Sequence, residues 1–215
     1  MVLDYGSQYT QLIARRAREL HIYSEILPGD ATLARVQALE PRALILSGGP
    51  HSVAAEGAPT VAGDILQYCT KEKVPILGVC YGLQLIAQLF EGQVAPADKR
   101  EYGRMAIDAV EGSVLFKEQE LHQEVWMSHG DEIKSMPPGF KVVANSAQGA
   151  IVGIEDASRL IFGVQYHPEV AHTPYGKALL SHFLLDICKC EPGWALENVL
   201  EEEVRPLIDC MLVGE

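Results

Sequence analysis

The chain has 215 residues, of which 48% are hydrophobic and 21% are charged, and this composition can supply the core of one α/β domain. Its 17 basic residues against 29 acidic residues give a net charge of −12, which argues against a protein that binds the phosphate backbone of nucleic acids. The longest apolar stretch, 74–90, is interrupted by proline, glycines and glutamines, so we expect no membrane-spanning helix. No secretion signal is visible in the sequence.

Cysteine usage bears on the compartment and on metal binding. The five cysteines form neither an even-numbered framework nor a C-x-x-C pair. This pattern favours a reducing compartment, and we expect a cytoplasmic protein without disulfides. Cys188 and Cys190 lack companion cysteines or histidines at the spacing of a zinc site, so no metal is expected.

Short apolar runs alternate with helical stretches over the first 90 residues of the sequence. The expected strands are 1–4, 43–46 and 75–79, and the expected helices are 8–20, 61–69 and 82–90. Strands that alternate with helices in this way predict right-handed βαβ units and a parallel sheet that is covered by helices on both faces.

After Gly92 the pattern changes. Apolar segments separated by Gly, Pro, Asn and Asp turns, with no long helix between them, predict antiparallel strands. The segments expected in this part are strands at 104–110, 125–128, 140–146 and 150–155, a further strand at 160–165 and a helix at 176–189. The expected fold is therefore α/β, an open and mostly parallel sheet with a smaller antiparallel section.

The segment 191–215 differs in composition from the rest of the chain. An apolar stripe at helical spacing runs beside the acidic residues Glu201–Glu203, and Pro206 interrupts any helix there. We expect one domain over residues 1–190, followed by a helical tail over 191–215 that leads to a further domain.

The segment 78–82, GVCYG, lies between an expected strand and an expected helix. Glycines two residues either side of a nucleophile are the pattern of a nucleophile elbow, here with Cys80 in place of serine. Such a turn projects the side chain above the carboxyl edge of the sheet, where the N-terminus of the next helix stabilises a thiolate or an oxyanion. The alternative is a buried structural cysteine in a tight turn.

A candidate base follows the expected strand 160–165, in the segment YHPE. His167 and Glu169 are two residues apart, so their side chains point the same way in an extended backbone. Such a pair would give Cys80 a general base oriented by a carboxylate, which is the arrangement of a nucleophilic triad. The alternative is a histidine that makes only local hydrogen bonds in a turn.

Adjacent glycines in the segment 47–50, SGGP, end the expected strand 43–46. They let the backbone approach a ligand closely and present its N–H groups, although an ordinary turn is the alternative. The sequence contains neither a G-x-x-x-x-G-K-[ST] motif nor an S-G-G-x-D-S loop, so we do not expect this chain to bind ATP.

Taken in this order, the SGGP, GVCYGLQ and YHPE segments resemble the class I, triad-type glutamine amidotransferase family, over residues up to about 189. The segments 3–10, LDYGSQYT, and 126–131, WMSHGD, are similar to the glutaminase domains of GMP synthetases. The resemblance implies an enzyme that hydrolyses the side-chain amide of L-glutamine through a γ-glutamyl thioester. It also implies that the ammonia passes to an ATP-dependent synthetase domain, which aminates XMP to GMP.

The resemblance further implies roles for individual residues. Cys80 is the nucleophile, His167 takes the thiol proton and gives it to the leaving ammonia, and Glu169 orients the imidazole. The backbone N–H groups of Gly49 and Tyr81 form the oxyanion hole. Four residues are expected to hold the α-amino and α-carboxylate groups of glutamine: Gln84, Ser128, His129 and Gly130. Asp131 is expected to face a second domain. No cofactor is expected in this chain, because ATP and Mg²⁺ belong to the synthetase domain, which we expect on the same longer chain.

Two other functions remain open. One is a stand-alone cysteine hydrolase of similar fold, which would cleave poly-γ-glutamate or peptide bonds rather than glutamine. The other is a non-catalytic regulatory or docking domain, but such a domain usually loses its nucleophile or base, and Cys80 and His167 are both present. Without a synthetase domain we expect the glutaminase activity of the chain to be weak.

Overall fold

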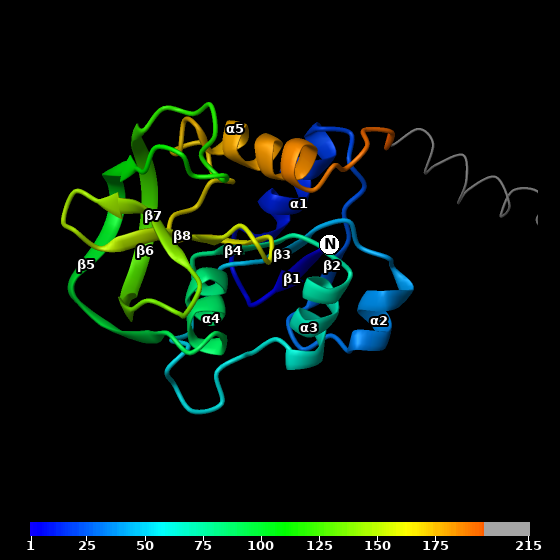
Figure 1. The fold of residues 1–215 in the computed structure, drawn as a ribbon, viewed down its shortest axis with the longest axis horizontal. Coiled ribbons are helices and arrows are strands. Elements are labelled where there is room, and N and C mark those ends of the chain that lie inside the picture. Colours follow the sequence, from blue (N-terminus) through cyan, green and yellow to red (C-terminus); the bar gives the residue numbers. More distant parts are fainter. Residues whose placement is uncertain (196–215) are drawn as a thin grey trace, which may run out of the picture.

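The computed structural model describes residues 1–195 of the chain (Figure 1). Its nine strands form one sheet in the order β2-β1-β3-β4-β9-β8-β7-β5-β6. The first five strands in this order are parallel to one another, and the remaining neighbours are antiparallel. Most of the helical tail expected over 191–215 lies outside the described residues, so that expectation stays a prediction.

The parallel half of the sheet contains the βαβ units. Its strands are β1 (Val2–Asp4), β2 (Ile26–Pro28), β3 (Leu44–Leu46), β4 (Ile76–Val79) and β9 (Ile161–Val164). The helices are α1 (Thr10–Glu19), α2 (Leu33–Ala38), α3 (Gly63–Lys71), α4 (Tyr81–Leu89) and α5 (Gly176–Ser181). The expected alternation of strands and helices is confirmed. Neither β2 nor α2 was expected, because segments of three and six residues are too short to show a clear period.

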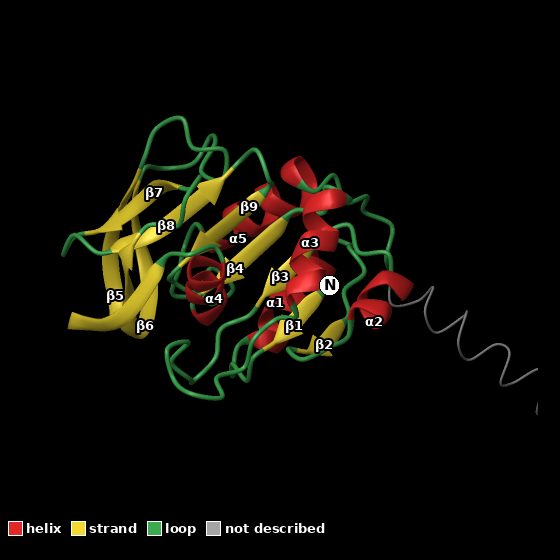
Figure 2. Cartoon of the chain, turned by 60° about the horizontal axis from the view of Figure 1, so that its bottom comes forward, coloured by secondary structure: helices red, strands yellow, loops and turns green. Residues whose placement is uncertain are grey.

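Alternate residues of the parallel strands face opposite sides of the sheet. Val2 and Ile45 pack in one apolar cluster with residues of α1 and α5. Leu3 and Leu44 pack in a second cluster with residues of α2, α3 and α4. The two groups of helices accordingly lie on opposite faces of the strands (Figures 1 and 2). Burial on both faces explains why these strands are almost continuously apolar.

The antiparallel half lies at one end of the molecule, where β5 and β6 form a long hairpin (Figure 2). Its strands are β5 (Gln93–Ala109), β6 (His122–Ser135), β7 (Lys141–Ser146) and β8 (Ile151–Asp156). The expected strands 104–110 and 125–128 cover only the apolar part of the hairpin. The remainder is polar and contains a register shift between Pro96 and Glu101, so it carries no regular alternation that would predict a strand.

The expected helix 176–189 divides into two parts. After α5 the chain continues as a π-helical turn, η1 (His182–Ile187). Phe183 and Leu184 are buried, as the apolar stripe predicts. His182, where the geometry changes, makes a ring-nitrogen contact to the Val114 carbonyl oxygen at 2.9 Å. The hydrophobic periodicity of the sequence does not encode this tertiary contact, so it could not predict where the helix divides.

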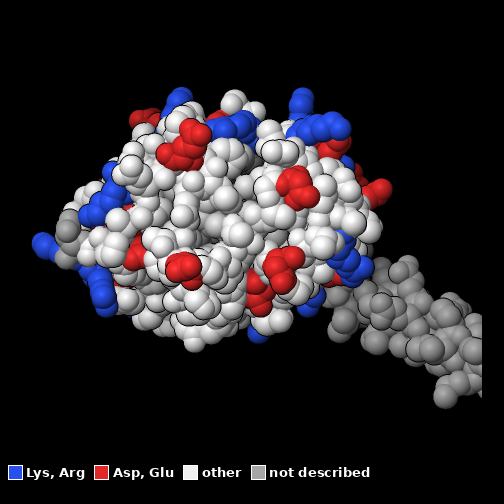
Figure 3. All heavy atoms as spheres, turned by 90° about the horizontal axis from the view of Figure 1, so that it is seen from below, with Lys and Arg blue, Asp and Glu red and all other residues white. Residues whose placement is uncertain are grey.

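Two expectations from the sequence concern the binding of a nucleic-acid backbone and the presence of a membrane-spanning helix. Acidic and basic side chains are interspersed on the face seen in Figure 3, and neither sign gathers into a patch there. That face therefore offers no basic track for a phosphate backbone. Among the helices of residues 1–195, none combines the length and the apolar character needed to cross a membrane.

Candidate active site

Cys80 lies at a sharp turn between β4 and α4, with a backbone φ of 53°. The flanking glycines are required by packing. A Cβ atom on Gly78 would lie 2.5 Å from the backbone of Gly82, and one on Gly82 would collide with the carbonyl oxygen of Leu46. The turn therefore needs glycine at both positions and holds the cysteine at the carboxyl end of β4.

His167 and Glu169 follow β9, the strand beside β4. The Nδ1 atom of His167 is 2.7 Å from Oε1 of Glu169, so the two side chains point the same way. The backbone around them is also fixed: His167 donates its N–H to the Trp126 carbonyl (3.0 Å) and its carbonyl accepts from Thr173 Oγ1 (2.7 Å). Arg16 Nε donates to the Glu169 carbonyl at 2.9 Å. The imidazole is thus held from several elements at once.

The surroundings of His167 decide its protonation. Burial lowers the pKa of this imidazole, but hydrogen bonds to Cys80 and Glu169, together with their negative charges, outweigh burial and raise it to about 10. Oε2 of Glu169 is buried and has no hydrogen-bond partner among the described residues, so the imidazolium is the main compensation for this carboxylate. His167 is therefore protonated at neutral pH and is ready to act as an acid.

Two further groups contact the sulfur of Cys80. Gln165 Nε2 donates to Sγ at 3.6 Å, and the Ser128 carbonyl oxygen lies 3.7 Å from Sγ. Gln165, which is fully buried, was not among the residues expected from the sequence. A signal was available: it lies two residues before His167, so the alternation that aligns His167 with Glu169 brings Gln165 to the same side.

Two hollows open beside Cys80. The hairpin hollow, of about 400 Å³, lies between the elbow, the SGGP loop and the β5–β6 hairpin. The loop hollow, of about 290 Å³, lies on the segment 6–9 and also reaches His167. The expected oxyanion, glutamine-binding and interdomain residues all line the hairpin hollow: Gly49, Tyr81, Gln84, Ser128, His129, Gly130 and Asp131. The structure therefore brings together residues that are up to 82 positions apart in the sequence.

The two expected oxyanion donors are well placed by the backbone. Tyr81 is the first residue of α4, where an N–H has no intrahelical acceptor. Gly49 has no room for a side chain, because a Cβ atom would lie 2.6 Å from the Tyr5 carbonyl oxygen. Within the described part of the chain, neither N–H reaches a protein acceptor. Both remain available to an oxyanion in the hairpin hollow.

Two of the expected binding residues, Gln84 and His129, are hydrogen-bonded to the expected interdomain residue, Asp131. Gln84 Nε2 donates both to the Asp131 carbonyl (3.0 Å) and to Gln165 Oε1 (3.1 Å), so its own amide oxygen is left to meet a ligand. The ring of His129 is buried, with Nδ1 at 2.9 Å from the Asp131 carbonyl and Nε2 at 3.0 Å from Glu101 Oε2. His129 can therefore offer a ligand its backbone rather than its imidazole.

The fold and this site fit one class of protein: an α/β enzyme that carries a cysteine at a strand-to-helix elbow beside a His–Glu pair. The family model described as glutamine amidotransferase class-I matches residues 1–187. The chain belongs to that family, and the expected resemblance and fold class are confirmed.

Curated relatives narrow the comparison. The GMP synthase [glutamine-hydrolyzing] of Thermobifida fusca (strain YX) is 45% identical over 204 residues, which are 95% of this chain and 38% of that protein. The protein of the same name from Lacticaseibacillus casei (strain BL23) is 46% identical over 205 residues, 95% of this chain and 39% of that protein. The chain thus spans about two fifths of the length of the curated relatives it matches.

Solved structures agree with this assignment. A candidate GMP synthase subunit from Thermoplasma acidophilum is 32% identical, with a TM-score of 0.74 over 87% of this chain and 92% of that chain. A glutamine amidotransferase from Thermotoga maritima is 22% identical, with a TM-score of 0.64 over 99% of this chain and 97% of that one. The second comparison shows the shared fold.

Proposed function

We propose that the chain hydrolyses the side-chain amide of L-glutamine and supplies the ammonia to a synthetase domain that aminates XMP to GMP. The observation that carries the first part is the position of Cys80, which lies between the His167–Glu169 pair and the hairpin hollow. The second part is supported by relatives named GMP synthase, of which this chain matches less than half.

The first half of the reaction forms a thioester. The Cys80 sulfur attacks the amide carbon of glutamine, and the carbonyl oxygen becomes an oxyanion that receives the N–H groups of Gly49 and Tyr81. Each donor of this kind contributes on the order of 100- to 1,000-fold in rate. When the tetrahedral intermediate collapses, the imidazolium of His167 gives its proton to the leaving nitrogen, so that ammonia departs and a γ-glutamyl thioester remains.

The second half regenerates the enzyme. His167, now neutral, takes a proton from a water molecule as that water attacks the thioester carbon. The same two N–H groups receive the oxyanion, and its collapse expels the Cys80 thiolate and releases glutamate. The carboxylate of Glu169 stabilises the imidazolium each time it forms, which is the role that its 2.7 Å contact to Nδ1 suits.

In this proposal, glutamine binds in the hairpin hollow. The free amide oxygen of Gln84 is an acceptor for the α-ammonium group. Ser128 and Gly130, which also line this hollow, offer backbone groups to the rest of the amino acid. Asp131 acts through its carbonyl, which holds Gln84, so a partner that moved this part of the hairpin would alter the pocket.

The partner in this proposal is an ATP-dependent synthetase domain on the same longer chain. ATP and Mg²⁺ would be bound by that domain, and no cofactor is proposed for residues 1–190. The cytoplasm, where thiols stay reduced, is the compartment that suits a nucleophilic cysteine.

Alkylation by the glutamine analogue 6-diazo-5-oxo-norleucine tests the glutaminase proposal. The expected result is one adduct by intact-mass spectrometry, mapped to Cys80 and blocked by L-glutamine, together with release of ammonia from glutamine. Hydrolysis of poly-γ-glutamate but not of glutamine would favour the stand-alone hydrolase. An unmodified Cys80 in the folded chain, with the synthetase domain also present, would overturn the proposal.

A further inference from the structure

A second buried acid–histidine pair lies behind the hairpin hollow. Glu101 and His129 expose only 1% of their side chains, and Glu101 Oε2 is 3.0 Å from His129 Nε2. The other carboxylate oxygen, Oε1, accepts from Ser146 Oγ at 2.6 Å. None of the catalytic steps described above uses this pair, although burying two ionisable groups is costly unless they are matched.

The contacts of His129 fix how many protons the pair holds. Nδ1 is 2.9 Å from the carbonyl oxygen of Asp131, and a carbonyl only accepts, so Nδ1 carries a hydrogen. The contact between Nε2 and Glu101 then needs one proton, held by either partner. The pair is therefore neutral overall, as an ion pair or as a carboxylic acid beside a neutral imidazole. This arrangement locks the Asp131 carbonyl in one direction.

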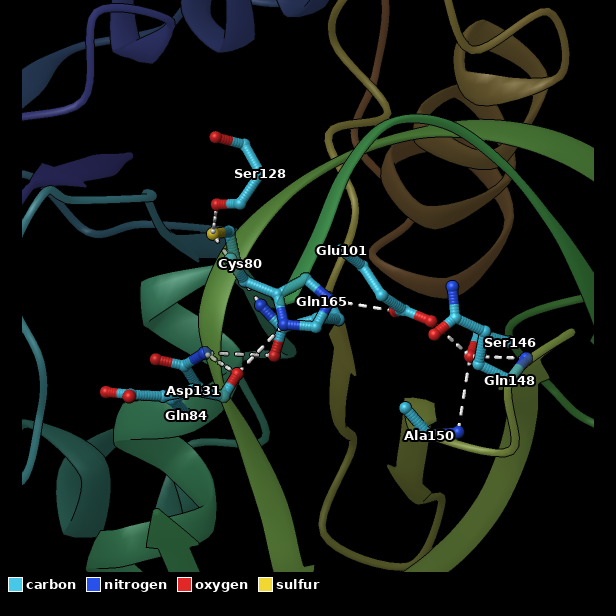
Figure 4. Close-up of polar contacts among 10 residues, drawn as sticks. Cys80, Gln84, Glu101, Ser128, Asp131, Ser146, Gln148, Ala150 and Gln165 are labelled. Atoms are coloured by element: carbon cyan, nitrogen blue, oxygen red, sulfur yellow. Dashed lines mark hydrogen bonds and ion pairs between the residues drawn. The ribbon is translucent and has the colours of Figure 1, made fainter. Parts of the chain in front are cut away.

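From that carbonyl a chain of hydrogen bonds leads to the nucleophile, as the labelled side chains in Figure 4 show. Gln84 Nε2 donates to the Asp131 carbonyl (3.0 Å) and to Gln165 Oε1 (3.1 Å). Gln165 Nε2 in turn donates to Cys80 Sγ (3.6 Å). Rotation of the Gln84 amide by 180° would place oxygen against oxygen, and rotation of the Gln165 amide would place two NH₂ groups against each other, so one arrangement satisfies the whole chain.

The outer end of this chain is anchored to the rest of the antiparallel half. Ser146 is the last residue of β7. Its Oγ accepts hydrogen bonds from the backbone N–H groups of Gln148 (3.3 Å) and Ala150 (3.2 Å) and donates one to Glu101. The pair thus joins β5 and β6 to the turn between β7 and β8.

We propose that Glu101 and His129 are positioning residues for the glutaminase reaction. By locking the Asp131 carbonyl they orient Gln84, and Gln84 orients Gln165 so that an N–H group faces the sulfur of Cys80. A donor to sulfur stabilises the thiolate that leaves when the thioester is hydrolysed. The inference rests on the proposed function and adds residues to it.

Four variants of the 215-residue chain test the proposal. Glu101→Leu removes the anchor, whereas Glu101→Gln keeps it, because its amide can donate to a neutral His129 and accept from Ser146. Gln165→Met removes the donor to sulfur, and the double variant Glu101→Leu with Gln165→Met forms a double-mutant cycle. The matched control is Glu124→Gln, an exposed carboxylate on the same hairpin.

The readout is kcat/KM for glutamine. We expect Gln165→Met to lower it about 30-fold and Glu101→Leu about tenfold, while Glu101→Gln and the control stay within about threefold of the parent. The double variant should be about as active as Gln165→Met alone, because both changes break one chain. An equal loss in Glu101→Gln and Glu101→Leu, or losses that multiply in the double variant, would overturn the proposal.

Two further measurements keep the test decisive. If circular dichroism shows that Glu101→Leu does not fold, Ser146→Ala replaces it. We expect Ser146→Ala alone to lower kcat/KM about threefold, and to cause no further loss when it is added to Gln165→Met. Alkylation of Cys80 by iodoacetamide needs no glutamine. If the parent protein is alkylated but hydrolyses no glutamine, the proposed function is wrong. The relative alkylation rates of the variants would still decide whether Glu101 acts on Cys80.

Discussion

In the parallel half of the sheet the proposed reacting groups come just after strands, Cys80 directly after β4 and His167 three residues after β9. In the antiparallel half the groups that line the hairpin hollow lie within β5 and β6, and a side-chain network holds the β6 segment in place. The first arrangement depends on backbone turns that a few local residues specify. The second depends on hydrogen bonds between β5, β6 and β7, which are distant in sequence. The proposed chemistry and the proposed recognition of glutamine thus depend on different kinds of structure within one sheet.

Removal of the proposed nucleophile gives the largest expected effect in the parallel half. Cys80→Ala should lower glutamine hydrolysis more than about 10⁴-fold, because no thioester can form. The circular dichroism spectrum should be unchanged, since alanine is smaller than cysteine and the elbow is set by glycines. Ammonia release is the measurement. If the variant released ammonia at the rate of the parent, Cys80 would not be the nucleophile.

The next largest effect is expected from Glu169, the buried carboxylate of the proposed triad. Glu169→Gln keeps an acceptor for Nδ1 but removes the charge that holds the imidazolium, so kcat for glutamine should fall about 1,000-fold. The same conservative change at Glu101 is expected to cost little, because that pair needs only one shared proton. Kinetics of the two variants measured together sharpen the comparison. Equal losses would mean that both halves of the sheet depend on charge.

The pKa of His167 also predicts a pH dependence of stability. The folded chain holds this proton with a pKa of about 10, whereas an unfolded histidine titrates near 6.5. Its contribution to stability is therefore complete below about pH 6.5 and is lost as the pH rises through about 10. In urea denaturation, the difference in free energy of unfolding between parent and His167→Gln should shrink by a few kcal/mol over this range. A difference that stays constant would show that Cys80 and Glu169 do not hold the proton.

The elbow itself predicts a smaller loss of stability. A Cβ atom on Gly82 would meet the Leu46 backbone, so Gly82→Ala should lower the free energy of unfolding by about 3 kcal/mol. Gly63 is the matched control: it begins α3 and a Cβ atom there would meet nothing within 4 Å. Gly63→Ala should be neutral or stabilise by up to about 1 kcal/mol. Equal losses in urea denaturation would mean that the turn does not need its glycines.

The same division explains what could be predicted from the sequence. The elbow and the His–Glu pair were predictable, because glycine spacing and extended alternation act over a few residues. Gln165 carries the same alternation signal, but it lies at the end of an apolar run and was included only in the expected strand 160–165. Glu101 carried no signal at all: its partners His129 and Ser146 are 28 and 45 positions away and meet it only when the strands pair.

The surface of the hairpin should matter least. Arg104 and Glu124 form an ion pair across β5 and β6 at 3.5 Å, with 62% and 54% of their side chains exposed. Exposed pairs of this kind contribute about 0.5 kcal/mol or less, because water and salt screen them. Glu124→Gln should therefore change the urea midpoint and kcat/KM for glutamine only marginally. A large loss of kcat/KM with unchanged stability would show that the outer face of the hairpin, and not only its buried network, shapes the hollow beside Cys80.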